Sequence, residues 1–132
     1  MPCTTSNGMK YELDATNQSL GRLASKIAFI LRGKNLVSYT PNELPDNEVT
    51  VENIKSAKFT GSKLSKKIYQ NYSGYHGGVK TRKLSELWES RPEYVLRGMV
   101  YNMLPINKVR DKIIKNLLFS NEGRSASGRK SK

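Results

Sequence analysis

Ser73 and His76 are the two residues of this chain whose types and spacing could support catalysis. They lie three residues apart in the segment Tyr72–Gly78, beside glycines that could form an anion-binding nest. A serine activated by a histidine base would make a hydrolase. Such a site also needs a group that orients the histidine, and an oxyanion hole. Because no Asp or Glu lies between Glu52 and Glu86, an enzyme built on this pair is the less favoured alternative.

The residues around this pair favour RNA binding. From Lys55 to Lys83 the chain has 29 residues, with eight Lys or Arg and no Asp or Glu. Such a segment cannot neutralise its own charge, so it attracts a polyanion. Tyrosine rings between the lysines can stack on bases, and glycine backbone can approach phosphates. The glycines match neither the P-loop nor the dinucleotide-binding motif, so we interpret them as turn residues. Because of the unneutralised charge, we expect RNA contacts over Lys63–Lys83.

The overall charge agrees with a nucleic-acid partner. The chain has 132 residues, enough for one domain, and 23 Lys or Arg against 11 Asp or Glu give a net charge of +12. An anionic membrane is the alternative partner. It is disfavoured because no apolar run approaches the roughly 20 residues that span a bilayer. The N-terminus also lacks the pattern of a secretory signal, and we find no basic amphipathic helix with bulky aromatic residues.

Metal, cofactor and disulfide chemistry are not expected. The chain has one cysteine, Cys3, and one histidine, so it cannot assemble a Cys/His metal site or an internal disulfide. A reducing cytoplasm is the expected compartment. We predict no catalytic residue, no metal, no cofactor and no small-molecule substrate.

The first half of the chain predicts strands and one clear helix. Alternation indicates a strand over Lys10–Asp14, and apolar residues at helical spacing predict a helix from Leu20 that Gly33 ends. Val49–Val51 is expected to be a strand followed by a helical turn. The intervening loop carries Glu43, Asp46 and Glu48, where RNA is least expected. Lys58–Lys63 predicts a strand that ends in a turn, and Lys67–Tyr69 a further extended segment.

The second half predicts three helices and a tail. Thr81 is expected to cap a helix that runs to about Ser90. Pro92 is expected to open a second helix, with an apolar stripe that includes Met99 and Met103, and Pro105 to end it. A third, basic helix is predicted from Asn107, with its apolar side buried. The residues expected to be buried there are Val109, Ile113, Ile114 and Leu117, and the exposed ones Lys108, Arg110, Lys112 and Lys115.

These elements divide the chain into three parts. Residues 1–9 are expected to be an N-terminal extension, residues 10–119 the folded domain, and residues 120–132 a basic, flexible tail. The tail has a low-complexity composition with little to bury. We expect it to become ordered when it binds RNA.

Taken together, these segments resemble the large-subunit ribosomal protein L-thirteen family, in its bacterial type. The resemblance follows the family's order from about Lys10 to Leu118. Any one of its motifs would be weak alone, but their order is specific. The main ones are Leu20-Gly-Arg-Leu-Ala-Ser25, Ser73-Gly-Tyr75 with Gly77-Gly78, Arg91-Pro-Glu93 and Met103-Leu-Pro105.

The resemblance implies a fold, partners and sites. The fold would be one three-layer α/β/α domain around a small, mostly parallel four-stranded sheet. The protein would bind large-subunit rRNA beside neighbouring large-subunit ribosomal proteins, support early subunit assembly and translation, and have no catalytic activity. It would act in a cytoplasmic ribosome, with an organellar ribosome left open. With the basic segment included, the expected RNA-binding residues are Arg22, Arg32, Lys34, Lys63, Lys66, Lys67, Tyr69, Tyr72, Ser73, Tyr75, His76, Lys80, Arg82, Lys83, Asn107, Lys108, Arg110 and Lys112.

The chain departs from the family pattern at two places. In the glycine-rich loop, Tyr72 and His76 stand where the family usually has His and Pro. After Pro105, Ile106 replaces a positively charged residue, and the family's closing Arg falls on Asp111. Arg110, one residue earlier, could compensate for that loss. At these two places, the RNA contacts of the family do not carry over directly to this chain.

Overall fold

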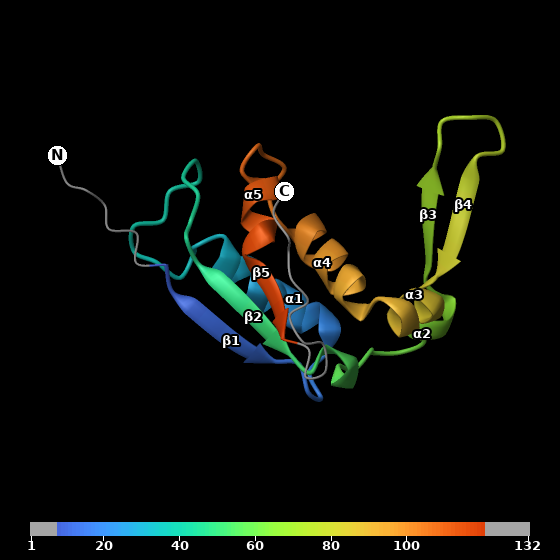
Figure 1. Ribbon diagram of the computed structural model, residues 1–132, viewed down its shortest axis with the longest axis horizontal. Helices are drawn as coiled ribbons and strands as arrows, with labels where there is room; N and C mark the ends of the chain where they lie inside the picture. Colours follow the sequence, from blue (N-terminus) through green and yellow to red (C-terminus); the bar gives the residue numbers. More distant parts are fainter. Residues whose placement is uncertain (1–7, 121–132) are drawn as a thin grey trace, which may run out of the picture.

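Residues 8–120 are described by the computed structural model, and residues 1–7 and 121–132 lie outside the described part (Figure 1). The predicted tail therefore lies outside it except for Ser120, as does most of the predicted N-terminal extension. Three parallel strands form the main sheet, with β2 in the middle. They are β1 (Lys10–Asp14), β2 (Glu48–Glu52) and β5 (Leu117–Ser120).

Two helices and one face of the sheet enclose the hydrophobic core. Alternation along β2 places Val49 and Val51 in the core, whereas Glu48, Thr50 and Glu52 point to the other face. Helix α1 (Leu20–Leu31) and helix α4 (Pro92–Met103) pack against each other with buried apolar stripes. Both helices were predicted from their spacing. Helix α1 ends where predicted, because Gly33 follows with a φ of 77°.

The turn that joins β1 to α1 is held by one carboxylate. Asp14 Oδ1 accepts hydrogen bonds from the Thr16 backbone N–H (2.9 Å), from Thr16 Oγ1 (2.7 Å) and from Asn53 Nδ2 (3.3 Å). The Thr16 hydroxyl, then the Thr16 backbone, then Asn53 lower the pKa of Asp14 by favouring its charged form. Asn53 itself has a φ of 51°. The carboxylate therefore ties the end of β1 to the turn after β2.

Replacing Asp14 with Ala should destabilise the protein near neutral pH and have little effect in acid. The lowered folded-state pKa means that the stabilisation is fully present above the ordinary carboxyl pKa of about 4 and is lost as pH falls through the lower value. The melting temperatures of wild type and Asp14→Ala should therefore differ near pH 7 and converge as the pH falls below the ordinary carboxyl pKa of about 4. Glu12→Ala is the control, because its side chain makes no hydrogen bond within residues 8–120. A gap for Asp14→Ala that stays constant with pH would contradict this role.

A second, antiparallel pair of strands stands apart from the main sheet. Strand β3 (Ile68–Tyr72) was predicted in part, but the prediction for its partner was wrong. Thr81 caps no helix: it lies in β4 (Val79–Lys83) and pairs with Gln70, and α3 (Leu84–Ser90) begins only after Lys83. Pairing with β3 overrides the local capping signal, because it satisfies the backbone groups of this stretch.

The mixed α/β fold is confirmed, but the main sheet of the described part has three strands rather than four. The predicted strand over Lys58–Lys63 is reduced to one parallel bridge between Ser19 and Lys58. Gly61, with a φ of 68°, then turns the chain into α2 (Lys63–Lys66). Beyond the bridge the segment has no strand partner because it turns away to form the base of the hairpin.

The predicted third long helix was also wrong. Helix α5 (Arg110–Ile113) and the 3₁₀ turn η2 (Ile114–Asn116) are short, and Leu117 then opens β5 beside β2. Ile113 and Leu117 are buried as expected, whereas Val109 and Ile114 are half-buried. Met103, expected in the core, is 47% exposed. The apolar run from Leu117 to Phe119 gains more burial as a strand next to Val49 and Val51 than as the end of a helix.

Candidate nucleic-acid interface

The hairpin of β3 and β4 projects away from the rest of the molecule (Figure 1). Every residue of both strands is exposed except Tyr69, which is half-buried and packs against the core. A two-stranded hairpin buries too little to be stable alone in water. This hairpin is anchored at its base by Tyr69 and by the backbone bond from Leu84 N–H to the Lys67 carbonyl (2.9 Å). The hairpin therefore presents its side chains to solvent rather than to the core.

The tip of the hairpin is shaped by glycines. Gly74 and Gly77 have φ values of 84° and 68°. At Gly78 a Cβ atom would collide with Ser73 Oγ, and the Ser73 backbone N–H donates to the Gly78 carbonyl (3.1 Å). Tyr75 is 85% exposed at this tip. The glycines thus hold a tight turn that leaves an aromatic ring free to stack.

Ser73 and His76, the pair on which the less favoured enzyme alternative depends, lie on the same tip. Ser73 and His76 are both exposed, and within residues 8–120 neither hydrogen-bonds the other or a carboxylate. The same part of the chain contains no group of three or more His, Cys, Asp and Glu residues placed to hold a metal ion. In the described part of the chain, no group is placed to orient His76 as a base.

The two faces of the hairpin differ in chemistry. Residues directly opposite in an antiparallel pair point to the same face. The pairs Tyr69–Arg82 and Asn71–Lys80 therefore form one face, which is basic. The other face is mixed, and Tyr72 on it is 73% exposed: it carries the pairs Ile68–Lys83, Gln70–Thr81 and Tyr72–Val79.

Lysines gather at the base of the hairpin. Lys63 and Lys66 belong to α2, and Lys67 connects it to β3, with Lys67 Nζ 5.1 Å from the centre of the Tyr69 ring. Within residues 8–120 none of the three forms an ion pair with a carboxylate. With Lys80 and Arg82 on the basic face, the structure brings together most of the predicted Lys63–Lys83 cluster. We call these five cationic residues the hairpin cluster.

The predicted residues on α1 lie apart from that cluster. Arg22 is exposed near the start of the helix, and Lys34 is exposed just beyond its end. Arg32 is half-buried, with its guanidinium carbon 5.5 Å from the centre of the Tyr39 ring. A partner that touched Arg22 and Lys34 together would have to run along a helix of about 18 Å.

The residues after Pro105 form an internal network around Tyr101. Arg110 donates hydrogen bonds from both Nε (2.7 Å) and an Nη atom to the Tyr101 carbonyl, and its guanidinium carbon lies 3.6 Å from the ring centre. The Tyr101 hydroxyl donates to Asp111 Oδ1 (3.0 Å), and Asn107 Oδ1 accepts from the Arg110 backbone N–H (3.0 Å). Asp111, where the chain departs from the family pattern, and its neighbour Arg110 thus join α5 to α4. Lys108 and Lys112 are exposed.

Replacing Arg110 with Ala should lower the free energy of unfolding by about 1–3 kcal/mol, because it removes charge-assisted hydrogen bonds to a backbone carbonyl. The measurement is urea unfolding followed by circular dichroism. Lys108→Ala is the matched control, an exposed cation two residues away whose loss should change stability by less than about 0.5 kcal/mol. Equal stabilities of the two variants would show that the Tyr101 network contributes nothing.

The outer face of the main sheet has the opposite charge. Strand register places Glu12, Asp14, Glu48 and Glu52 on that face, with Lys10 Nζ 3.5 Å from Glu48 Oε2. The hairpin cluster and this acidic face belong to different elements of the fold. The net charge of +12 is therefore unevenly distributed over the surface.

Comparison with known proteins places the chain in a family. The sequence model described as Ribosomal protein L13 matches residues 9–123. Large ribosomal subunit protein uL13 of Syntrophobacter fumaroxidans is 46% identical over 105 residues, which cover 80% of this chain and 74% of the relative. The uL13 of Baumannia cicadellinicola is 44% identical over 107 residues, or 81% of this chain and 75% of the relative. Large ribosomal subunit protein uL13c of Gracilaria tenuistipitata is 43% identical over 95 residues, which cover 72% of this chain and 66% of the relative.

The match extends over both halves of the fold, from β1 to the end of β5, and so includes the hairpin and the lysines at its base. Relatives at 40% identity or more cover most of the chain. The chain belongs to the ribosomal protein L13 family.

Proposed function

We propose that this protein is a structural constituent of the large ribosomal subunit, that it binds large-subunit rRNA, and that it has no catalytic activity. The observation that carries the proposal is the family itself: relatives 40–46% identical over most of the chain are named large ribosomal subunit protein uL13. The protein acts in the ribosome, in the cytoplasm or in an organelle. A role in early subunit assembly and translation belongs to the same proposal.

The RNA-binding surface is proposed to centre on the hairpin and its base. The exposed lysines and Arg82 neutralise phosphates and release their counterions, which favours binding without reading sequence. Exposed tyrosine rings and the tight glycine turn fit a folded RNA surface. The core of the proposed surface is Lys63, Lys66, Lys67, Tyr69, Tyr72, Ser73, Tyr75, His76, Lys80, Arg82 and Lys83, and the outlying contacts are Arg22, Arg32, Lys34, Asn107, Lys108, Arg110 and Lys112.

The remaining surface is proposed to serve other contacts. The acidic outer face of the sheet repels phosphate, so it suits a neighbouring ribosomal protein better than RNA. Residues 10–119 are proposed as the folded domain, with residues 1–9 as an extension and residues 120–132 as a tail that becomes ordered on rRNA. A four-stranded sheet in a three-layer arrangement stays a prediction.

The experiment that tests rRNA binding is a filter-binding titration with large-subunit rRNA at several salt concentrations. If about six or more phosphates are neutralised, affinity should fall by about 10³-fold between roughly 50 and 200 mM salt. Small-subunit rRNA is the control and should compete poorly at the higher salt. A flat salt dependence, or equal competition by both rRNAs, would contradict a specific, phosphate-dominated interface.

A further inference from the structure

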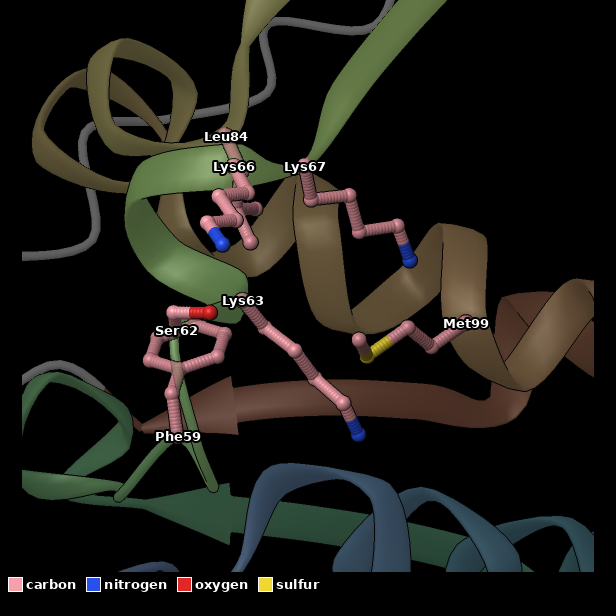
Figure 2. A pocket seen from close by; sticks show the side chains of 7 residues that line it. All are labelled: Phe59, Ser62, Lys63, Lys66, Lys67, Leu84 and Met99. Atoms are coloured by element: carbon pink, nitrogen blue, oxygen red, sulfur yellow. The ribbon is translucent and has the colours of Figure 1, made fainter.

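Two hollows adjoin between helix α4 and the base of the hairpin. The first, of about 370 Å³, lies under α2 and is shown in Figure 2. The second, of about 230 Å³, lies between α4 and the basic face of the hairpin. Lys67 and Met99 line both hollows, so the two form one groove, which we call the α4 groove.

The floor of the α4 groove is apolar. Phe59, Leu84 and Met99 line the first hollow. Phe59 is held in place by Trp88, with ring centres 4.7 Å apart and planes at 84°. Farther along, α4 contributes Gly98, where an added Cβ atom would meet nothing within 4 Å. The floor therefore offers an apolar surface with open space above it, in which a flat ring can lie.

The rim of the α4 groove is cationic. Figure 2 shows Lys63, Lys66 and Lys67 extending from α2 and its end around the first hollow, and Arg82 lines the second. Among residues 8–120, no Asp or Glu lines either hollow. Cations without paired carboxylates, above an apolar floor, favour a ligand that carries both an anionic group and a ring. A nucleotide has this combination.

Unpaired amides lie where the edge of a base would reach. Asn71 on the hairpin and Asn102 on α4 line the second hollow. Within residues 8–120, neither side chain makes a hydrogen bond. Amide groups can donate to and accept from the edges of unpaired bases. Tyr94, 61% exposed on the same helix, adds an aromatic ring.

We propose that the α4 groove binds unpaired nucleotides of RNA, with a base over Met99 and the neighbouring phosphates beside Lys63, Lys66 and Lys67. The inference rests on the proposed function and names a part of the RNA surface that charge alone does not identify. Unpaired nucleotides are favoured over a duplex because bases within a helix stay stacked on each other and cannot enter a hollow of this size.

The direct test observes the floor of the groove by NMR. The chain has four methionines, so their ¹³C-labelled methyl groups give few signals. A single-stranded oligoribonucleotide of about six nucleotides should shift the Met99 signal and leave in place that of Met9, which precedes β1 and lines neither hollow. A duplex of equal length should bind without shifting Met99. An unmoved Met99 signal at saturating single strand, or an equal shift with duplex, would overturn the proposal.

A filled groove provides the second test. Gly98→Leu should weaken binding of the same oligoribonucleotide by about tenfold or more, because it places a side chain where the base would lie and changes no charge. Gly21→Leu is the matched control, an exposed glycine in α1 with nothing within 4 Å of its Cβ position, and it should bind within about twofold of wild type. Either substitution replaces a helical glycine by a better helix former.

The outcomes separate this inference from the proposed function. If Gly98→Leu binds the oligoribonucleotide as wild type does, the α4 groove does not bind unpaired nucleotides. That result would hold even if the protein associates with the large subunit. If circular dichroism shows that Gly98→Leu is unfolded, Asn102→Leu, at an exposed position of the same groove, takes its place with the same expected loss. If wild type does not associate with the large subunit, the proposed function fails whatever Met99 shows.

Discussion

Reversing the charges of Lys66, Lys67, Lys80 and Arg82 to Glu should weaken binding to large-subunit rRNA by about 10³-fold or more near 100 mM salt. Each lost phosphate contact costs roughly tenfold at that ionic strength, and each added carboxylate repels the RNA backbone. All four side chains are exposed, so the fold should persist. The measurement is a filter-binding titration, with circular dichroism as the check on folding.

The control for charge reversal uses cations outside the hairpin cluster. Lys10 lies beside Glu48 on the acidic face of the sheet, and Lys26 is exposed on α1. Reversing these two should weaken binding far less per charge. Equal losses per charge from the two sets would mean that net charge, and not the hairpin cluster, drives the interaction. In that case the affinity for rRNA would depend on the number of reversed charges and not on their positions.

Shortening the hairpin should separate binding from folding. Replacing residues 70–81 with an Asn-Gly turn keeps the opposed pair Tyr69 and Arg82 and suits a two-residue hairpin loop. The removed residues are exposed, except for the half-buried Gly78, and absent from the core cluster, so stability should change by less than about 1 kcal/mol. Affinity for rRNA should fall by about 10²-fold, because two stacking rings, Tyr72 and Tyr75, are lost with Lys80.

A same-length variant identifies what the shortened hairpin loses. Replacing only Tyr72 and Tyr75 with Ser keeps the backbone turn and every charge, and it should produce most of the loss in affinity. Full affinity in the shortened protein would exclude the hairpin from the RNA surface. Full affinity in the Ser variant alone would assign the loss to the backbone and Lys80.

The sequence predicted the elements whose signals are local and strong. Helix α1 shows a complete apolar stripe that ends at Gly33, and Pro92 marks the start of α4. Strand β1 alternates clearly. For these elements the tertiary fold stabilises what local spacing already favours, so prediction and structure agree.

The failed predictions involve segments whose partners lie far away in sequence. The stretch Val79–Lys83 has no buried face, and its structure comes from pairing with β3. Leu117–Ser120 follows a helical pattern in sequence but pairs with β2, more than sixty residues earlier. Lys58–Lys63 was predicted as a strand, yet after its bridge to Ser19 it turns into α2. The periodicity of a short segment carries no information about the strand with which it will pair.

The candidate site shows the same division. Charge and composition predict RNA contacts at the lysines and tyrosines of the hairpin, because an acid-free basic run is a property of the sequence itself. They did not identify Met99 and Phe59 as the floor of a groove, since an apolar residue at helical spacing predicts core. The placement of α2 and the hairpin beside α4, which local spacing does not indicate, leaves those side chains half-buried in a hollow. Charge alone also did not show that Arg110, a predicted RNA contact, has its guanidinium bound to Tyr101 within the protein.

The most direct test of the central claim is where the full-length protein sediments in a sucrose gradient. A tagged copy expressed at low level in its own cells should co-migrate with the large subunit and with whole ribosomes, and it should be absent from the small-subunit fraction. The variant with reversed charges at Lys66, Lys67, Lys80 and Arg82 should be depleted from both positions. Wild-type protein that stays at the top of the gradient, or that follows the small subunit, would contradict its assignment to the large ribosomal subunit.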